Sequence, residues 1–324
     1  MRQDNSVFRS LSASVILQNT DMENPFGTKR YRTFDYEMKR LFGAKVIKLS
    51  VDAGFGCPNR KNGNGCIFCT ESGSGEFAGN PALKSASVTE QLEYQKKMLS
   101  GKWNSDKYIA YFQSYTNTYA PVEVLRQKYD EALSCGVLGL AIATRPDCLD
   151  NEVLALLQSY KCPLWLELGL QTVTCHREIN RGYDNDVFVK SAEALRARNI
   201  PFCVHVIFGL PWETVEQTLE TVRFAVENGA FALKLHMLYI DKTAPLAEFY
   251  SKNKFHLLTM EEYIDAVTEA LAIIPQNIVI HRITGDGKKS NLIAPLWTTD
   301  KRRVLNEIDK AMIRKNYFQG CKSK

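Results

Sequence analysis

The stretch VIKLSVDAGFGCPNRKNGNGCIFC, residues 46–69, joins a short apolar run to a loop that carries three cysteines. The run Val46–Val51 has the length and composition of a buried strand. The loop places Cys57, Cys66 and Cys69 with the spacing C-x8-C-x2-C. Its glycines and asparagines allow a tight backbone around a bulky group. The stretch therefore predicts a strand of a buried sheet followed directly by a candidate metal-binding loop.

Further short apolar runs alternate with amphipathic segments along the rest of the chain. Ser87, Thr214 and Thr259 each begin a capping box, which predicts the start of a helix. Runs that are apolar almost throughout are typical of parallel strands buried on both faces. The chain is therefore predicted to form an α/β fold with a parallel sheet, either open or closed into a barrel. The further strands are expected at Tyr108–Phe112, Leu138–Ala143, Leu164–Leu168, Phe202–Phe208, Ala232–Met237 and Ile278–His281.

The composition is that of an ordinary globular protein of 324 residues. A hydrophobic content of 45% excludes a disordered chain, and the apolar runs are far shorter than the roughly 20 residues of a membrane span. We expect a disordered extension at residues 1–23, a core domain at 24–280 and a basic extension at 281–324 that packs on it. The basic extension carries 11 lysines and arginines against four acidic residues, whereas residues 45–280 carry 23 against 27. Such an extension is either a solvated helix face or a phosphate-binding surface.

The cysteines indicate a metal centre rather than disulfides. Nine is an odd number and no secretory signal is apparent, so a reducing cytoplasm is expected. Three thiolates can hold three irons of a [4Fe–4S] cluster and leave the fourth iron open to another ligand. Zinc is an alternative, but structural zinc needs a fourth ligand, and the next histidine along the chain is His176. Three unliganded thiols are the remaining alternative.

A set of motifs spread over residues 24–319 resembles the radical S-adenosylmethionine (SAM) superfamily, and within it the YtqA/YhcC subgroup, whose core is similar to that of the Elp3 family. The common superfamily triad is C-x3-C-x2-C, and the longer first gap of this chain matches the subgroup. The resemblance implies a partial (βα)6-type TIM barrel with a C-terminal helical extension. The motifs are KRYRTF at 29–34, GFGCPNR at 54–60, CIFC at 66–69, GSGEFAGN at 73–80, YIAYFQSYTNTYAPVEVLR at 108–126, ATRPDCL at 143–149, LWLELGLQT at 164–172, HVIFGLP at 205–211 and HRITGDG at 281–287.

The resemblance also implies the chemistry of the three cysteines. Cys57, Cys66 and Cys69 would ligate a [4Fe–4S] cluster, and SAM would bind its fourth iron. An electron from a donor such as flavodoxin or ferredoxin would then cleave SAM to a 5′-deoxyadenosyl radical, which removes a hydrogen atom from the substrate. The protein would position these groups and exclude water.

The SAM site is expected at the carboxyl ends of the strands, as in barrels generally. After the second strand the superfamily often has a Gly-Gly-Glu-like segment, and this chain has other polar residues there. Glu167 lies in an otherwise apolar strand and needs a partner, which is either SAM or Arg145. Histidines within apolar strands are more often core residues with satisfied hydrogen bonds than catalytic groups. The expected SAM-binding residues are Gln113, Thr116, Asn117, Thr144, Arg145, Glu167, Gln171, His205 and Gly209.

The YtqA/YhcC resemblance implies a tRNA substrate. The subgroup is associated with wobble-uridine modification, at the step that turns a 5-carboxymethylaminomethyl group into the 5-aminomethyl form. Arg282 and Asp286 are expected to line the substrate end of the barrel, and Cys203 is a candidate hydrogen-atom donor. The residues expected to contact tRNA phosphates are Lys288, Lys289, Lys301, Arg302, Arg303, Arg314 and Lys315.

Two other functions fit the same residues. One is a radical SAM oxidase that acts on a small molecule such as a tetrapyrrole, whose enzymes share a similar barrel. The other is a zinc-stabilised RNA-binding protein without catalysis. Cleavage of SAM that depends on RNA would separate the first from a tRNA enzyme, and the brown colour of an iron–sulfur protein would exclude the second.

Overall fold

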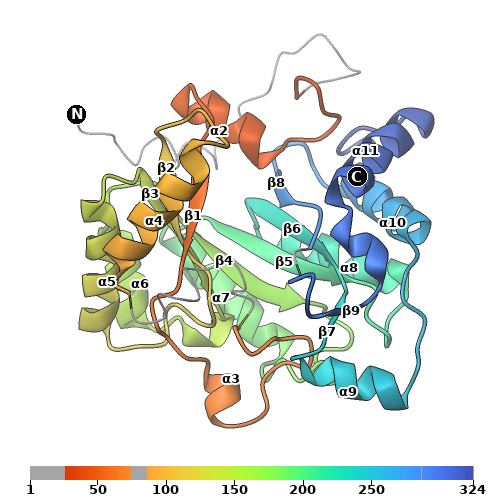
Figure 1. Cartoon of the computed structure of the whole chain (residues 1–324), viewed down its shortest axis with the longest axis horizontal. Coiled ribbons are helices and arrows are strands. Elements are labelled where there is room, and N and C mark those ends of the chain that lie inside the picture. The colour runs from red at the N-terminus through yellow and green to blue at the C-terminus, as the bar shows by residue number, and fades with distance from the viewer. Residues whose placement is uncertain (1–25, 74–85, 286, 324) are drawn as a thin grey trace.

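The computed structural model describes residues 26–73, 86–285 and 287–323. Seven parallel strands form one curled sheet in the order β1-β2-β3-β4-β5-β6-β8, with helices along its outer side (Figure 1). The α/β class and the partial barrel expected from the sequence are thereby confirmed, whereas residues 1–23 lie outside the described part. The strands are β1 (Ile47–Val51), β2 (Tyr108–Phe112), β3 (Gly139–Thr144), β4 (Leu164–Gln171), β5 (Phe202–Phe208), β6 (Ala232–Met237) and β8 (Val279–Arg282).

The helices begin where the sequence carries its capping signals. Ser87, Thr214 and Thr259 each form the expected capping box with the residue three positions later. A small antiparallel pair, β7 (Ile240–Asp241) with β9 (Leu292–Ala294), lies outside the main sheet. The helices are α2 (Phe34–Phe42), α3 (Pro58–Lys61), α4 (Val88–Ser100), α5 (Val122–Ser134), α6 (Asn151–Ser159), α7 (Asn185–Ala197), α8 (Val215–Glu227), α9 (Pro245–Lys252), α10 (Met260–Ile273) and α11 (Lys301–Arg314), and the 3-10 turns are η3 (Pro146–Cys148) and η4 (Leu296–Thr299).

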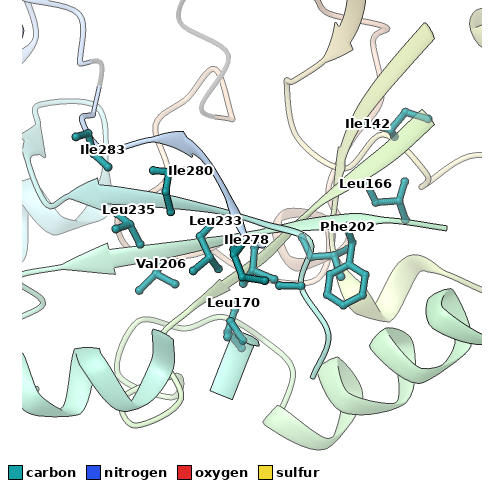
Figure 2. Packing of buried hydrophobic residues seen from close by; sticks show 14 of the residues in the cluster. Ile142, Leu166, Leu170, Phe202, Val206, Leu233, Leu235, Ile278, Ile280 and Ile283 are labelled. Atoms are coloured by element: carbon teal, nitrogen blue, oxygen red, sulfur yellow. The ribbon is translucent and has the colours of Figure 1, made fainter. Parts of the chain in front are cut away.

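The main core lies between the outer face of the sheet and the helices. Alternate residues of each strand point to this face, because side chains in a strand alternate between its two sides. Figure 2 shows Leu170, Phe202 and Val206 on the side of the sheet where the helices lie. Leu170 is fully buried there. β4 runs three residues further than the sequence predicts, because Gly169 and Gln171 still pair with β5.

The other face of the sheet encloses the interior of the barrel. The part of this interior near the amino ends of the strands is packed with apolar side chains, including Trp165, Cys203 and Val279. Met38 and Phe34 of α2 pack against these residues. Because this layer is closed, the polar side chains two positions further along several strands are left to line the space that remains at the carboxyl ends.

The basic C-terminal segment packs on the barrel through α11. Its buried face consists of Val304, Ile308, Ala311 and Met312, and α11 lies against α10 (Figure 1). Arg302, Arg303 and Arg314 are on the exposed face, as are Lys288 and Lys289 in the preceding segment. Lys315 instead pairs with Asp265 and Glu269 of α10. None of the described helices is long and apolar enough to cross a membrane.

Candidate active site

A cavity of about 220 Å³ opens at the carboxyl ends of the parallel strands. The three cysteines line it, and so do most of the polar residues that the sequence singles out. This is the edge at which barrels place their ligands. The predicted residues that line the cavity are Gln113, Thr116, Thr144, Arg145, Glu167, Gln171, His205 and Arg282.

The cysteine loop is ordered by its own side chains. Cys57 precedes the short helix α3, whose first residue is Pro58. Asn59 donates to Cys66 Sγ at 3.5 Å, and Arg60 donates to the backbone carbonyl of Cys69 at 2.9 Å. The two bonds hold the Cys66 thiol and the backbone at Cys69 in place.

A second segment holds the loop from the side of β4. The Asn59 side chain donates to the Asn180 carbonyl at 2.7 Å, and Asn180 donates to the Gly65 carbonyl at 2.7 Å. Gly182 has φ +81°, and a Cβ there would lie 2.6 Å from Asn59 Oδ1. Only glycine therefore allows the two segments to approach this closely.

The donor set suits an iron–sulfur cluster. Burial raises the pKa of the Cys66 thiol to about 12, so a thiolate at that position needs a cationic partner such as iron. Among residues 26–73, 86–285 and 287–323, no three histidine, cysteine or carboxylate side chains are placed to hold a single metal ion. The same finding covers Cys57, Cys66 and Cys69, so it does not favour an iron–sulfur cluster over zinc.

Three of the predicted residues that the structure describes do not line the cavity. Asn117 is fully buried, and its amide donates to the carbonyls of Ser114 and Ala143, so it supports the loop after β2. Gly209 packs against Leu258, and Cys203 lies in the closed apolar layer. Asp286 lies outside the described residues.

Glu167 is the centre of a buried ion-pair network. Its carboxylate lies 2.8 Å from Lys48 Nζ and is also paired with Lys234. Since an ionised carboxylate can only accept, His205 Nε2 donates to it across 3.0 Å. The alternative that paired Glu167 with Arg145 is wrong, because Arg145 pairs with Asp147 at 2.7 Å and donates to the Arg181 carbonyl.

Burial and charge set the protonation of this network. Burial on its own raises the pKa of Glu167. The charges of Lys234 and Lys48 outweigh burial and hold this pKa well below its usual value. Burial, helped by the charge of Lys48, lowers the pKa of Lys234 to about 8 against the attraction of Glu167. Burial and the nearby lysines lower the pKa of His205 to about 4 and that of His281 to about 3. Both histidines are therefore neutral near pH 7.

Sequence reasoning missed the lysines of this network. Lys48 and Lys234 each interrupt a mostly apolar strand. A lysine in such a run needs a buried anion, the same argument that singled out Glu167. Tyr111 accepts from Lys234 Nζ at 3.0 Å and also lines the cavity.

The backbone is strained at two places on the cavity wall. Gln171 has φ 61° at a bulge between β4 and β5, and Tyr115 has φ 57° in the loop after β2. Positive φ at residues other than glycine costs about 1 kcal/mol or more and is concentrated at functional sites. Near Gln171, Arg181 donates to the carbonyls of Leu170 and Thr172, both at 2.7 Å, and holds the end of the strand in this shape.

Comparisons with known proteins agree with the geometry. A model of the radical SAM superfamily matches residues 53–225, and a model of the radical SAM C-terminal domain matches residues 231–314. "Uncharacterized protein YtqA" of Bacillus subtilis is 39% identical over 315 residues, which cover 94% of this chain and 96% of YtqA. The resemblance to the YtqA/YhcC subgroup is confirmed.

More distant proteins share part of the sequence or the fold. A "tRNA uridine(34) acetyltransferase" of Methanocaldococcus infernus is 25% identical over 183 residues, which cover 51% of this chain and 34% of that protein. The solved structure of the archaeal Methanocaldococcus infernus Elp3 superposes with a TM-score of 0.64 at 15% identity, over 85% of this chain and 64% of that one. At this identity the likeness shows the fold alone.

Proposed function

Because the chain belongs to the radical SAM superfamily, we propose that Cys57, Cys66 and Cys69 hold a [4Fe–4S] cluster beside a bound SAM. The observation that carries this proposal is that three thiols and a set of polar strand-end residues line one cavity. When bound, the cluster and SAM supply a radical that removes a hydrogen atom from the substrate. A one-electron donor such as flavodoxin or ferredoxin is needed to start each turnover.

Residues on the cavity wall can position SAM. Ser50 donates to Gln113 Oε1 at 3.2 Å, which orients the Gln113 amide. Thr144 lines the wall at the end of β3, and Gln171 lines it at the end of β4. Hydroxyl and amide groups suit the ribose hydroxyls and the methionine end of SAM, both of which need hydrogen-bond partners once they leave water.

We propose a tRNA substrate, modified at the wobble uridine from 5-carboxymethylaminomethyl to 5-aminomethyl. One support is the similarity to a relative named as a tRNA uridine(34) acetyltransferase. Another is the exposed basic face of the C-terminal segment, which suits RNA phosphates. A base must leave its stack to enter the cavity, and unstacked anticodon bases do so at low cost. Enzyme and substrate would meet in the cytoplasm.

The test is mass spectrometry of tRNA nucleosides after incubation with the reconstituted enzyme, SAM and a reductant. We expect 5-aminomethyluridine to accumulate as 5-carboxymethylaminomethyluridine disappears. A strain that lacks the gene should show the opposite accumulation. If SAM is cleaved at the same rate with and without RNA, a small-molecule substrate replaces tRNA as the better proposal.

The exposed basic face predicts a second result. Changing Arg302 and Arg303 to glutamate should weaken tRNA binding and flatten its salt dependence. Each phosphate that is no longer neutralised lowers the slope of log affinity against log salt by about 0.7–0.9. The matched control changes Lys97 and Lys190, which are exposed on α4 and α7, to glutamate. Fluorescence anisotropy at several salt concentrations measures both variants. Equal slopes in the native chain and the Arg302 and Arg303 variant would mean that this face is only solvated.

A further inference from the structure

The inner wall of the cavity carries more positive than negative charge. Lys234 of β6 and Arg282 of β8 are paired in the sheet, and both line the cavity. Lys48 of β1 lies 2.8 Å from the Glu167 carboxylate. Among the lining residues that the structure describes, Glu167 is the only carboxylate. Lys234 and Lys48 thus share the single Glu167 carboxylate in a site shielded from water, where charge imbalance is costly.

Hydrogen-bonding capacity is left over at the same place. The described contacts of Lys234 use Glu167 and Tyr111, whereas an ammonium group has three donors. His236 lines the cavity two residues further along β6, and its Nε2 is buried without a hydrogen-bond partner among the described residues. Buried polar atoms are normally hydrogen-bonded, and a ligand bound in the cavity would supply the partner that this nitrogen lacks.

We propose that Lys234, Arg282 and His236 form a subsite that binds a carboxylate carried by the substrate. This inference rests on the proposed function, in which the modified uridine bears a carboxymethylamino group. Lysine and arginine make the strongest hydrogen bonds to carboxylates, and a neutral imidazole adds one more donor. The subsite also separates substrate from product, since the 5-aminomethyl product has no carboxylate.

A carboxylate fits this position better than a phosphate does. The subsite lies within the strands rather than in the loops, in a cavity of about 220 Å³. An RNA backbone is a continuous chain and cannot enter such a space, whereas the substituent of an extruded base can. The carboxylate of SAM is the competing source of the same chemistry, and the experiment separates the two.

The test compares three anticodon stem-loop RNAs that differ only at the wobble uridine. One carries the carboxymethylaminomethyl group, one its methyl ester and one the aminomethyl group. On the unaltered full-length protein we expect the acid to bind at least about tenfold tighter than the ester, the effect of a charge-assisted hydrogen bond. A ratio near one overturns the subsite without any variant being made.

Two variants then assign the effect to residues. Arg282→Gln and His236→Gln should each reduce the ratio of acid to ester affinity, while the affinity for the ester RNA stays unchanged. The matched control is Arg223→Gln, an exposed arginine on α8, which should leave the ratio unaltered. If both cavity variants keep the native ratio, these residues do not bind the carboxylate. A fall in SAM affinity with an unchanged ratio would assign the subsite to SAM and overturn the proposal.

The free nucleosides separate this proposal from the tRNA proposal. If none of the RNAs binds or is converted, the proposed function fails. The ratio of the free acid nucleoside to its methyl ester, measured on the unaltered protein, then still decides whether the carboxylate subsite exists.

Discussion

Replacing Glu167 by glutamine is expected to destabilise the protein by about 3–5 kcal/mol, because the change removes the charge that compensates two buried lysines. In the native chain the carboxylate pairs with Lys48 and Lys234 and accepts from His205. Glutamine has nearly the same shape, so the loss is electrostatic rather than a packing defect. Urea unfolding of both proteins measures the difference.

The same variant should show a distinct pH dependence. Burial already lowers the pKa of Lys234 to about 8 while Glu167 is present. Without the carboxylate, Lys234 in the folded variant loses its proton at a lower pH, whereas an unfolded lysine keeps it to about pH 10. The unfolded state of the variant then binds more protons than its folded state, so the free energy of unfolding of the variant rises with pH. We expect the deficit relative to the native chain to shrink as the pH rises to about 8.

The matched control is Glu213→Gln. Glu213 accepts from the hydroxyls of Thr172, Thr174 and Thr218, and burial raises its pKa, so its replacement leaves no lysine without a partner. The expected cost is about 1 kcal/mol. If the Glu167 and Glu213 variants lose the same small amount of stability, the ion-pair network does not hold the sheet together.

Changing Cys66 to alanine is expected to abolish the iron–sulfur cluster. Anaerobically reconstituted native protein should contain about four irons per chain, and the variant less than about one, since only two protein ligands remain. The brown colour and the visible absorbance of the cluster should disappear together with the iron. Iron analysis and absorption spectroscopy on the same samples measure both.

The control for this experiment is Cys321→Ala. Cys321 lies in the C-terminal segment and does not line the cavity, so its removal should leave the iron content unchanged. Full retention of iron in a protein that lacks Cys57, Cys66 and Cys69 together would contradict the cluster assignment and with it the proposed chemistry.

The sequence by itself determined the sheet and the place of the site. Short runs such as Phe202–Phe208 are apolar except for one histidine, and that composition is stable only between two covered faces. The capping boxes at Thr214 and Thr259 likewise depend on residues three positions apart. The spacing of the three cysteines, which indicated a metal-binding loop, is also a property of one short stretch of sequence. All of these signals are local, so they can be read before the chain is folded.

Only the tertiary structure decided which polar side chains meet. Glu167 was expected to pair with SAM or Arg145, yet the curled sheet brings it against Lys48 of β1 and Lys234 of β6. The Asn117 amide group could donate to a ligand, but in the fold it donates to the backbone carbonyls of Ser114 and Ala143. Residues far apart in the chain become neighbours only when the sheet curls and closes its apolar lower layer. No local spacing records that closure, because it depends on how all the strands pack together.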